Sequence, residues 1–373
     1  MGMKKHITVI EGDGIGPEVT RQAIQVLNAI AQEFHHEFTY QHALMGAVAI
    51  DETGEALPEA TVEACMQSDA VLLGAIGHPR YDNDPTATHR PEQALLQLRQ
   101  RLQLYANIRP IESYPALQHL SAFKADRIEG VDFLFVRELT GGIYFGDKTL
   151  SADGNLAIDP CIYERSQIER VALLAFQYAQ KRKHKLTLID KSNVLVTSKL
   201  WRKVVMEIAT EFPEVEVTYM YVDNAAMQLI QDPRQFDVIL TENMFGDILS
   251  DEASMLSGSI GMVPSAAIGK GTALFEPVHG AYPQAAGKDI ANPIGAILSA
   301  ALMLDYFGLN KEAEVMRQGV NWTLKHGFVT KDIDPTNFYF TSTIGELICD
   351  FVAGKIPGAI HKDNIELRKS TII

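Results

Sequence analysis

The chain has 373 residues, of which 46% are hydrophobic and 21% charged, a composition that argues against disorder and a length that favours two domains. Its formal net charge of −14 would repel nucleic acid and acidic membrane surfaces, so we expect neither as a partner. Three scattered cysteines, and no apolar run of membrane-spanning or signal-peptide length, favour a soluble cytoplasmic protein with reduced thiols.

Short apolar runs typical of buried strands alternate with amphipathic stretches typical of helices. The strands are predicted at residues 7–10, 71–73, 133–136, 186–189, 215–221 and 238–240. Helices are predicted after the first strand and at roughly 92–103, 167–182, 198–211 and 293–306. This alternation indicates an α/β fold with a largely parallel core. Since no linker divides the chain cleanly, we expect two interleaved lobes between which the chain crosses twice.

A glycine-rich turn at residues 12–16 follows the first strand, where many dinucleotide-binding folds carry a phosphate loop. The GxGxxG pattern would need a glycine at position 17, which is Pro17 in this chain. Proline followed by Glu18 is typical of a helix start. We therefore interpret the turn as a helix start and expect other loops to hold any dinucleotide.

Three arginines, Arg99, Arg109 and Arg137, occur within the first 140 residues, two of them just beyond apolar runs. Any one of them could be an ordinary surface ion pair. An acidic protein that binds an anion, however, needs such a cluster to reverse the local potential. Because a guanidinium pairs with a carboxylate through two hydrogen bonds, three of them could bind a dianion in a fixed orientation.

Two residues are candidates for proton transfer. Gly141 and Gly142 let the backbone approach a ligand and present the phenol of Tyr144. Lys191 directly follows a predicted strand, where partial burial would suit it to act as a general base, although taken alone it could equally be a surface lysine.

Three aspartates are candidate metal ligands. Asp247 and Asp251 are four residues apart, so on a helix they would project from one face and repel each other unless a cation lay between them. Asp223, at a predicted strand end, could supply a third carboxylate. Such oxygen ligands select Mg²⁺ or Mn²⁺ over zinc. Helix-capping aspartates are the structural alternative.

Taken together, these segments resemble those of the β-decarboxylating dehydrogenases, the family of isocitrate and 3-isopropylmalate dehydrogenases. The resemblance extends from residues 12–18 to residues 341–345, and residues 221–223, 246–251 and 276–280 are its most specific parts in combination. It implies the two-lobed α/β fold of that family, with parallel and mixed central sheets and not a Rossmann fold. Residues 1–104 and 263–373 would form the cofactor lobe, and residues 105–262 the substrate, metal and dimerisation lobe.

The resemblance also implies roles for the candidate residues. The three arginines would bind the malate carboxylates, and Asp223, Asp247 and Asp251 would bind Mg²⁺ or Mn²⁺, with Asp223 also near the substrate. Lys191 would take the hydroxyl proton, and Tyr144 would protonate the enolate after carbon dioxide leaves. Because Lys191 and Asp223 would come from the neighbouring subunit, catalysis would require a homodimer.

Substrate choice would depend on residues 90–96. Leu95 and Leu96 could pack against an isopropyl group, with Val194 closing the pocket and Glu92 beside it, whereas a third carboxylate would be left unpaired there. We therefore expect oxidative decarboxylation of 3-isopropylmalate to 4-methyl-2-oxopentanoate, a step of leucine biosynthesis. D-malate, tartrate or homoisocitrate as substrate is the nearest alternative. A catalytically silent subunit is a further alternative, disfavoured because the proton-transfer and metal residues are all present.

NAD is the cofactor that the resemblance implies. Asp289 could accept hydrogen bonds from the ribose hydroxyls and would repel a 2′-phosphate, so NAD is favoured over NADP. Asn292 would contact the adenine. Residues 78–81 and 281–286 depart from the usual family sequence in loops that bear on cofactor affinity. The expected cofactor contacts are Ile15, Gly74, Ala75, Ile76, Gly77, Glu92, Asn193, Glu276, His279, Gly280, Ala281, Asp289 and Asn292.

Overall fold

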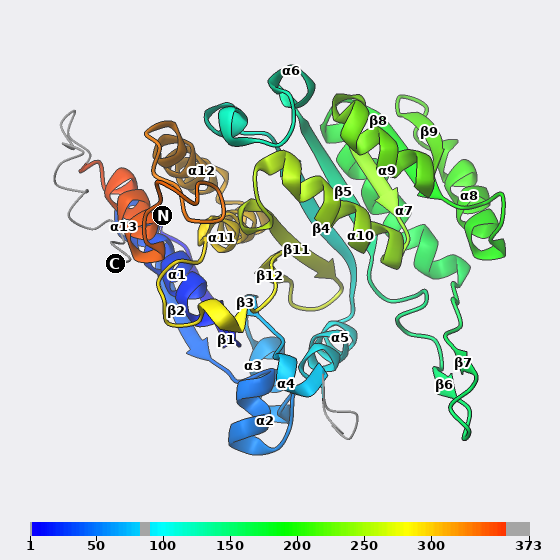
Figure 1. Ribbon diagram of the computed structural model, residues 1–373, viewed down its shortest axis with the longest axis horizontal. Coiled ribbons are helices and arrows are strands. Elements are labelled where there is room, and N and C mark those ends of the chain that lie inside the picture. Colours follow the sequence, from blue (N-terminus) through cyan, green and yellow to red (C-terminus); the bar gives the residue numbers. More distant parts are fainter. Residues whose placement is uncertain (1, 83–89, 356–373) are drawn as a thin grey trace.

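One ten-stranded sheet passes through the molecule (Figure 1). The computed structural model describes residues 2–82 and 90–355. The strands lie in the order β2-β1-β3-β12-β11-β4-β5-β10-β8-β9. Their bounds are β1 Lys4–Gly12, β2 Glu37–His42, β3 Ala70–Ala75, β4 Leu104–Glu112, β5 Asp132–Glu138, β8 Lys185–Asp190, β9 Glu216–Tyr221, β10 Val238–Thr241, β11 Pro264–Gly269 and β12 Leu274–Pro277.

The helices lie between these strands, and the predicted helices correspond to α1, α5, α7, α8 and α11. Helix α1 has its proline in the first turn, as the sequence predicts. The α-helices of the described residues are α1 Gly16–Phe34, α2 Ala47–Thr53, α3 Glu59–Gln67, α4 Pro79–Asp82, α5 Pro91–Arg101, α6 Ala125–Ile128, α7 Arg165–Lys181, α8 Val196–Ala209, α9 Val222–Gln231, α10 Asn243–Ser254, α11 Ile294–Tyr306, α12 Asn310–Lys325 and α13 Thr341–Val352.

The sheet is parallel in its two outer parts and antiparallel at its centre. β2, β1, β3 and β12 run parallel to one another, as do β5, β10, β8 and β9. Between them, β11 is antiparallel to both β12 and β4, and β4 is antiparallel to β5. The predicted mixed α/β fold is therefore confirmed, although the central strands β4, β11 and β12 are absent from the strands predicted along the chain.

Side chains alternate between the two faces of the sheet and so form separate apolar cores. Ile7 and Val9 of β1 pack in one cluster with α1, α11 and α13, whereas Ile10 packs in another with α3 and α5. A third cluster joins β5 and β10 to α9 and α10. Helix α5 thus packs on one half of the sheet and α10 on the other, and both helices contribute to the site described below.

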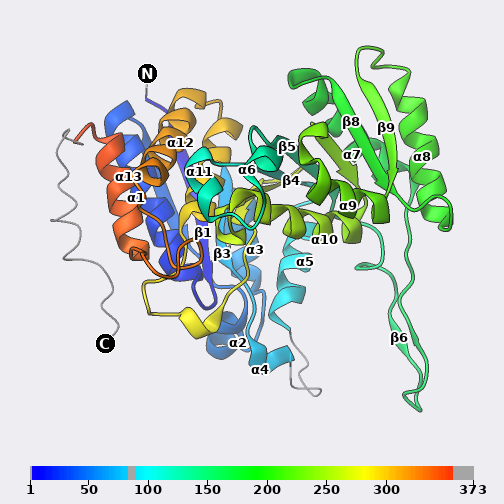
Figure 2. The ribbon, with the colours of Figure 1, turned by 45° about the horizontal axis from the view of Figure 1, so that its top comes forward.

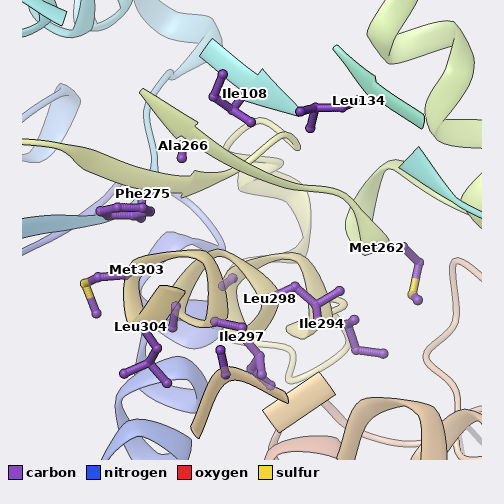
Figure 3. Packing of buried hydrophobic residues seen from close by; sticks show 14 of the residues in the cluster. Ile108, Leu134, Met262, Ala266, Phe275, Ile294, Ile297, Leu298, Met303 and Leu304 are labelled. Carbon is purple, nitrogen blue, oxygen red and sulfur yellow. The ribbon is translucent and has the colours of Figure 1, made fainter. Parts of the chain in front are cut away.

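Helix α11 is buried along nearly its whole length, which explains its almost uninterrupted apolar sequence. Ile294, Ile297, Leu298 and Leu304 lie below the part of the sheet that carries Phe275 and Ala266 (Figure 3). None of the described residues forms a helix that is both long and apolar enough to cross a membrane.

A two-stranded ribbon, β6 (Thr149–Leu150) with β7 (Ala157–Ile158), extends away from the sheet (Figure 2). Its side chains Leu150, Leu156 and Ile158 are 69%, 59% and 48% exposed. Within one chain this ribbon has no core of its own.

We expect the core around α11 to respond to side-chain volume. Ile297 is fully buried, so Ile297→Ala should lower the free energy of unfolding by about 2–5 kcal/mol, and Ile297→Val by only about 0.5–1.5 kcal/mol. Urea denaturation of the three proteins measures both. Equal losses for the two variants would contradict the packing described.

Candidate functional site

A cavity of about 350 Å³ lies where the two parts of the sheet meet, and we call it the central cavity. It is lined by residues from both parts of the chain, namely Gly74, Ala75, Ile76, Glu92, Leu95, Leu96, Arg99, Arg109, Arg137, Tyr144, Lys148, Asp247, Ser265, Glu276, Pro277, Val278, His279 and Gly280. The structure therefore brings together most of the residues that the sequence singles out.

Arg109 and Arg137 lie on the adjacent antiparallel strands β4 and β5, and both are buried. Arg109 donates to Asp251 Oδ1 at 2.8 Å and to Ser250 Oγ at 2.7 Å, and its Nε donates to Asn107 Oδ1 at 2.7 Å. These bonds occupy the guanidinium on several sides and fix its plane.

Arg137 is held by the same helix, α10, through residues nearer the N-terminus of that helix. Its Nε and Nη2 both donate to Asn243 Oδ1, at 3.1 and 2.8 Å, and its Nη1 pairs with Asp247. Burial, and then the charge of the neighbouring Arg109, lower the pKa of Arg137 to about 10. Arg137 therefore stays charged at neutral pH, with Asp247 offsetting part of the repulsion.

Arg99, at the end of α5, pairs with Glu276 of β12. Arg99 Nη2 lies 2.7 Å from Glu276 Oε1, and the two side chains are only 9% and 10% exposed. The Nε of Arg99 is buried and has no hydrogen-bond partner among the described residues. The central cavity thus contains a guanidinium donor that a ligand could use.

Tyr144 follows the glycine pair and reaches the same cluster. Its hydroxyl donates to Asp247 Oδ2 at 2.9 Å. Burial, and then the Asp247 charge, raise the pKa of Tyr144 to about 12. The phenol is therefore protonated at neutral pH and can serve as a proton donor.

The predicted helical pair of aspartates is present on α10. Asp247 and Asp251 are 35% and 49% exposed at the side chain. Burial alone would raise the pKa of Asp247, but Arg137 and Arg109 outweigh it and lower the net value. Burial, reinforced by Asp247 and opposed by Arg109, raises the pKa of Asp251.

Lys191 and Asp223 lie apart from this cluster and pair with each other. Lys191 follows β8, Asp223 begins α9, and the Nζ–Oδ1 distance is 2.5 Å. Asp223 is 61% exposed at the side chain, and its hydrogen bond with Lys191 lowers its pKa. Within the described residues of one chain, no three acidic, histidine or cysteine side chains meet to hold a metal. The three predicted metal ligands therefore do not assemble within a single chain.

The loops expected on the cofactor side form one wall of the central cavity. His279 follows β12 and is buried, and burial lowers its pKa. Its Nδ1 lies 3.0 Å from the carbonyl oxygen of Gly280, while its buried Nε2 has no partner among the described residues. A neutral imidazole that donates through Nδ1 would leave Nε2 free to accept a hydrogen bond from a ligand.

Several expected cofactor contacts have other partners in the structure. Asp289 accepts from the Ser342 backbone N–H at 2.8 Å and hydroxyl at 2.6 Å, at the start of α13. Asn292 donates to Asp332 Oδ2 and accepts from the Ile294 backbone N–H, both at 3.0 Å. Neither residue lines the central cavity. The hydrogen bonds with Ser342 give Asp289 a role at the N-terminus of α13 that is not evident from the sequence.

Six more of the expected site residues lie outside the lining of the central cavity. Two of them border it, because Gly77 directly follows a lining residue and Asp251 contacts the lining residue Arg109. Ile15 is 5% exposed and packs in the main core, whereas Val194 is 64% exposed. Ala281 is buried, and Asn193 is exposed beside Val194. Val194 therefore does not close this cavity within its own chain.

Some lining residues carry no clear sequence signal. Lys148 and Ser265 line the central cavity, and Asn107 and Asn243 orient the arginines from fully buried positions. The one available signal is Asn107, a polar residue two positions before Arg109 in a strand that is apolar at most other positions.

The fold and the central cavity define an α/β protein with an arginine-rich anion site beside buried glycine loops. Comparison with known proteins identifies the family to which this fold and site belong. Residues 6–348 match the family model described as isocitrate/isopropylmalate dehydrogenase. The 3-isopropylmalate dehydrogenase of Geobacillus kaustophilus (strain HTA426) is 53% identical over 343 residues, covering 91% of this chain and 92% of that protein.

Two other proteins agree with this assignment. The 3-isopropylmalate dehydrogenase of Bacteroides fragilis (strain YCH46) is 47% identical over 352 residues, covering 94% of this chain and 99% of that protein. The crystal structure of isocitrate dehydrogenase from Methylococcus capsulatus superposes with a TM-score of 0.84 at 33% identity, covering 94% and 99% of the two chains. The chain belongs to the isocitrate/isopropylmalate dehydrogenase family.

The burial of His279 predicts a pH dependence of stability. Its pKa is lowered in the folded state, so below the ordinary value of about 6.5 the unfolded chain binds a proton that the folded chain does not. The stability advantage of the parent over His279→Gln should therefore shrink as the pH falls from about 7.5 to about 5.5. Urea denaturation across this range measures it. Parallel stability curves for the two proteins would contradict the prediction.

Proposed function

We propose that this protein catalyses the NAD-linked, Mg²⁺- or Mn²⁺-dependent oxidative decarboxylation of 3-isopropylmalate to 4-methyl-2-oxopentanoate in leucine biosynthesis. The observation that carries the proposal is the buried arginine cluster with an apolar wall beside it. The relatives that are about half identical over nearly the whole chain, and that bear the name 3-isopropylmalate dehydrogenase, support the same substrate.

Three guanidiniums suit a small dicarboxylate. Arg99, Arg109 and Arg137 now pair with carboxylates of the chain itself, and those pairs mark where a substrate carboxylate would find its hydrogen bonds. Substrate binding is then an exchange of one set of carboxylates for another. Such an exchange avoids leaving a buried positive charge unpaired, which would cost about 3–5 kcal/mol.

Leu95 and Leu96 provide the apolar wall. Both line the central cavity one turn before Arg99 on α5. An isopropyl group would pack against the two leucine side chains, whereas the third carboxylate of isocitrate would be desolvated there without gaining a hydrogen-bond partner. This arrangement favours 3-isopropylmalate over isocitrate.

The acidic residues of α10 fit a hard divalent cation. Asp247 and Asp251 project from one face of the helix next to the substrate arginines, and their oxygens are the ligands that Mg²⁺ and Mn²⁺ prefer. Asp223 of a neighbouring subunit would complete the set. When bound, the metal ion supplies a Lewis acid for the 2-hydroxyl and its adjacent carboxylate.

Two residues would move protons. Lys191 of the neighbouring subunit would accept the proton of the 2-hydroxyl, and Tyr144 would deliver a proton to the carbon that loses carbon dioxide. The protonated phenol of Tyr144 and its hydrogen bond to Asp247 support that second role.

NAD would occupy the side of the central cavity formed by residues 74–77 and 276–280. The unpartnered Nε2 of His279 is the observation that fits a ligand there. Asp289 keeps lone pairs besides those used by Ser342, so it could still accept from ribose hydroxyls. The remaining expected contacts would reach NAD through backbone atoms or after a change in conformation; these are Ile15, Asn193, Ala281 and Asn292. When bound, NAD supplies the hydride acceptor.

A homodimer with shared active sites is part of the proposal. Met227 and Ile230 of α9 and Ile248 and Met255 of the α10 region are 44–60% exposed, which is unusual for so many large apolar side chains on neighbouring helices. The ribbon β6–β7 exposes further apolar side chains, Leu150, Leu156 and Ile158. A second copy would cover these residues and bring Lys191, Asp223 and Val194 to the other chain's central cavity.

We place the division into lobes at the sheet centre, with residues 1–104 and 263–373 in one lobe and 105–262 in the other. The chain passes that centre on β4 and β11, which pair with each other. A cytoplasmic location is supported by the free thiols of all three cysteines.

The direct test measures NADH formation at 340 nm with Mg²⁺ and 3-isopropylmalate, D-malate, tartrate, homoisocitrate or isocitrate, using NAD or NADP. We expect the highest kcat/KM with 3-isopropylmalate and NAD, and loss of turnover with a chelator. Preference for another hydroxy acid would contradict the proposed substrate, and no turnover with any of them would favour a catalytically silent subunit.

Leu96→Ser tests the apolar wall. Removing the leucine side chain should lower kcat/KM for 3-isopropylmalate on the order of tenfold or more, because Leu96 is half-buried and burial of an apolar group of this size against the substrate contributes about 1.5–3 kcal/mol. The kcat/KM for D-malate, which has no isopropyl group, should change much less. Equal losses with both substrates would show that Leu96 does not contact the substituent.

Mixed dimers test the shared active site. Lys191→Met and Tyr144→Phe should each lower kcat about 10²–10⁴-fold on their own. After co-refolding, about a quarter of parent activity should return, because mixed dimers would hold one intact site each. If no activity returned although mixed dimers had formed, the two residues would belong to the same chain's site.

A further inference from the structure

The glycine-rich turn at residues 12–16 does more than start α1. Asp13 is only 5% exposed, and its side chain accepts hydrogen bonds from three backbone N–H groups, each at 2.9 Å. Oδ2 accepts from Ala47 and Gly77, and Oδ1 accepts from Val48. One buried carboxylate therefore joins three segments that are distant in the sequence.

The backbone of the turn is tied to both loops of the central cavity. Asp13 N donates to the carbonyl oxygen of Ala75 at 2.7 Å, and Ile15 N donates to that of Ala281 at 2.8 Å. A Cβ at Gly12 or Gly14 would lie 2.0 Å from these same carbonyl oxygens, and both glycines have positive φ. Only glycine permits this close approach.

The acceptor must be a carboxylate for all three bonds to form. Helix α2 begins after Gly46, which has no side chain to cap it, so Asp13 accepts the helix's first N–H groups in its place. The third donor, Gly77, ends the loop whose residues 74–76 line the central cavity. An asparagine would turn an NH₂ group toward at least one of these donors.

We infer that Asp13 is a positioning residue for the nucleotide cofactor, which fixes residues 75–77 against the turn at residues 12–16 before the cofactor binds, while Ile15 of the same turn holds residue 281. The inference rests on the proposed function, which places NAD beside these two loops. None of the hydrogen bonds of Asp13 reaches the arginine cluster. Its loss should therefore affect binding of the nucleotide much more than binding of the hydroxy acid.

Asp13→Asn is the variant that tests this inference, with Asp237→Asn as the matched control. Asp237 is also buried and accepts from the Lys183 and Lys185 backbone N–H groups and from Arg182, away from the central cavity. Fluorescence titration with NADH gives the nucleotide Kd, and initial rates give the two KM values. We expect Asp13→Asn to raise the Kd for NADH and the KM for NAD about tenfold or more, with the KM for 3-isopropylmalate changed less than about threefold. Asp237→Asn should leave all three close to the parent values.

A Kd for NADH within twofold of the parent in folded Asp13→Asn would overturn the inference, as would equal increases in both KM values. Should Asp13→Asn fail to fold, hydrogen exchange in the parent protein decides the question. We expect slow exchange of the Gly77 and Val48 amides both before and after NADH is added. Protection that arises only with NADH would overturn the inference. If the parent itself bound no NADH, the proposed function would fail, an outcome distinct from failure of Asp13 alone.

Discussion

The structure depends on the neutralisation of three buried arginines in a strongly acidic chain. Arg109 and Arg137 lie on neighbouring central strands, where their charges repel each other and burial removes the stabilisation by water. Three carboxylates offset the free-energy cost of burying these charges, namely those of Asp247 and Asp251 on α10 and Glu276 on β12. Because the pairs join different elements, the central strands, α10 and α5 have to pack together at the central cavity. Since each pair uses a carboxylate, the same guanidiniums are held where they could bind the carboxylates of the proposed substrate.

The antiparallel centre of the sheet makes this convergence possible. β4 and β11 place segments from the two parts of the chain side by side, so Arg109 and Ser265 come within reach of one cavity. The parallel parts on either side bring the glycine loop after β3 and helix α10 after β10 to the same region. Apolar packing of α11 under β11 and β12 supports the arrangement from below (Figure 3).

Much of this could be predicted from the sequence, and the failures have physical reasons. Strands with continuous apolar runs, such as residues 133–136, are evident from composition alone. β4 is not, because Asn107 and Arg109 are polar residues buried within it for the sake of the site. Most side chains of the central cavity belong to short motifs that can be recognised in the sequence. The role of Asp289 at the N-terminus of α13 cannot, because it depends on Ser342, which is distant in the chain. Likewise, the pairing of Lys191 with Asp223, away from the arginine cluster, depends on how β8 and α9 pack, which sequence patterns do not show.

The most direct test of the central claim is a crystal structure of the protein with 3-isopropylmalate and Mg²⁺ bound. We predict that the two substrate carboxylates replace protein carboxylates as partners of Arg99, Arg109 and Arg137, with Asp247 and Asp251 turned toward the metal ion. A complex in which the arginines keep their present partners, and the substrate carboxylates bind elsewhere, would contradict the account.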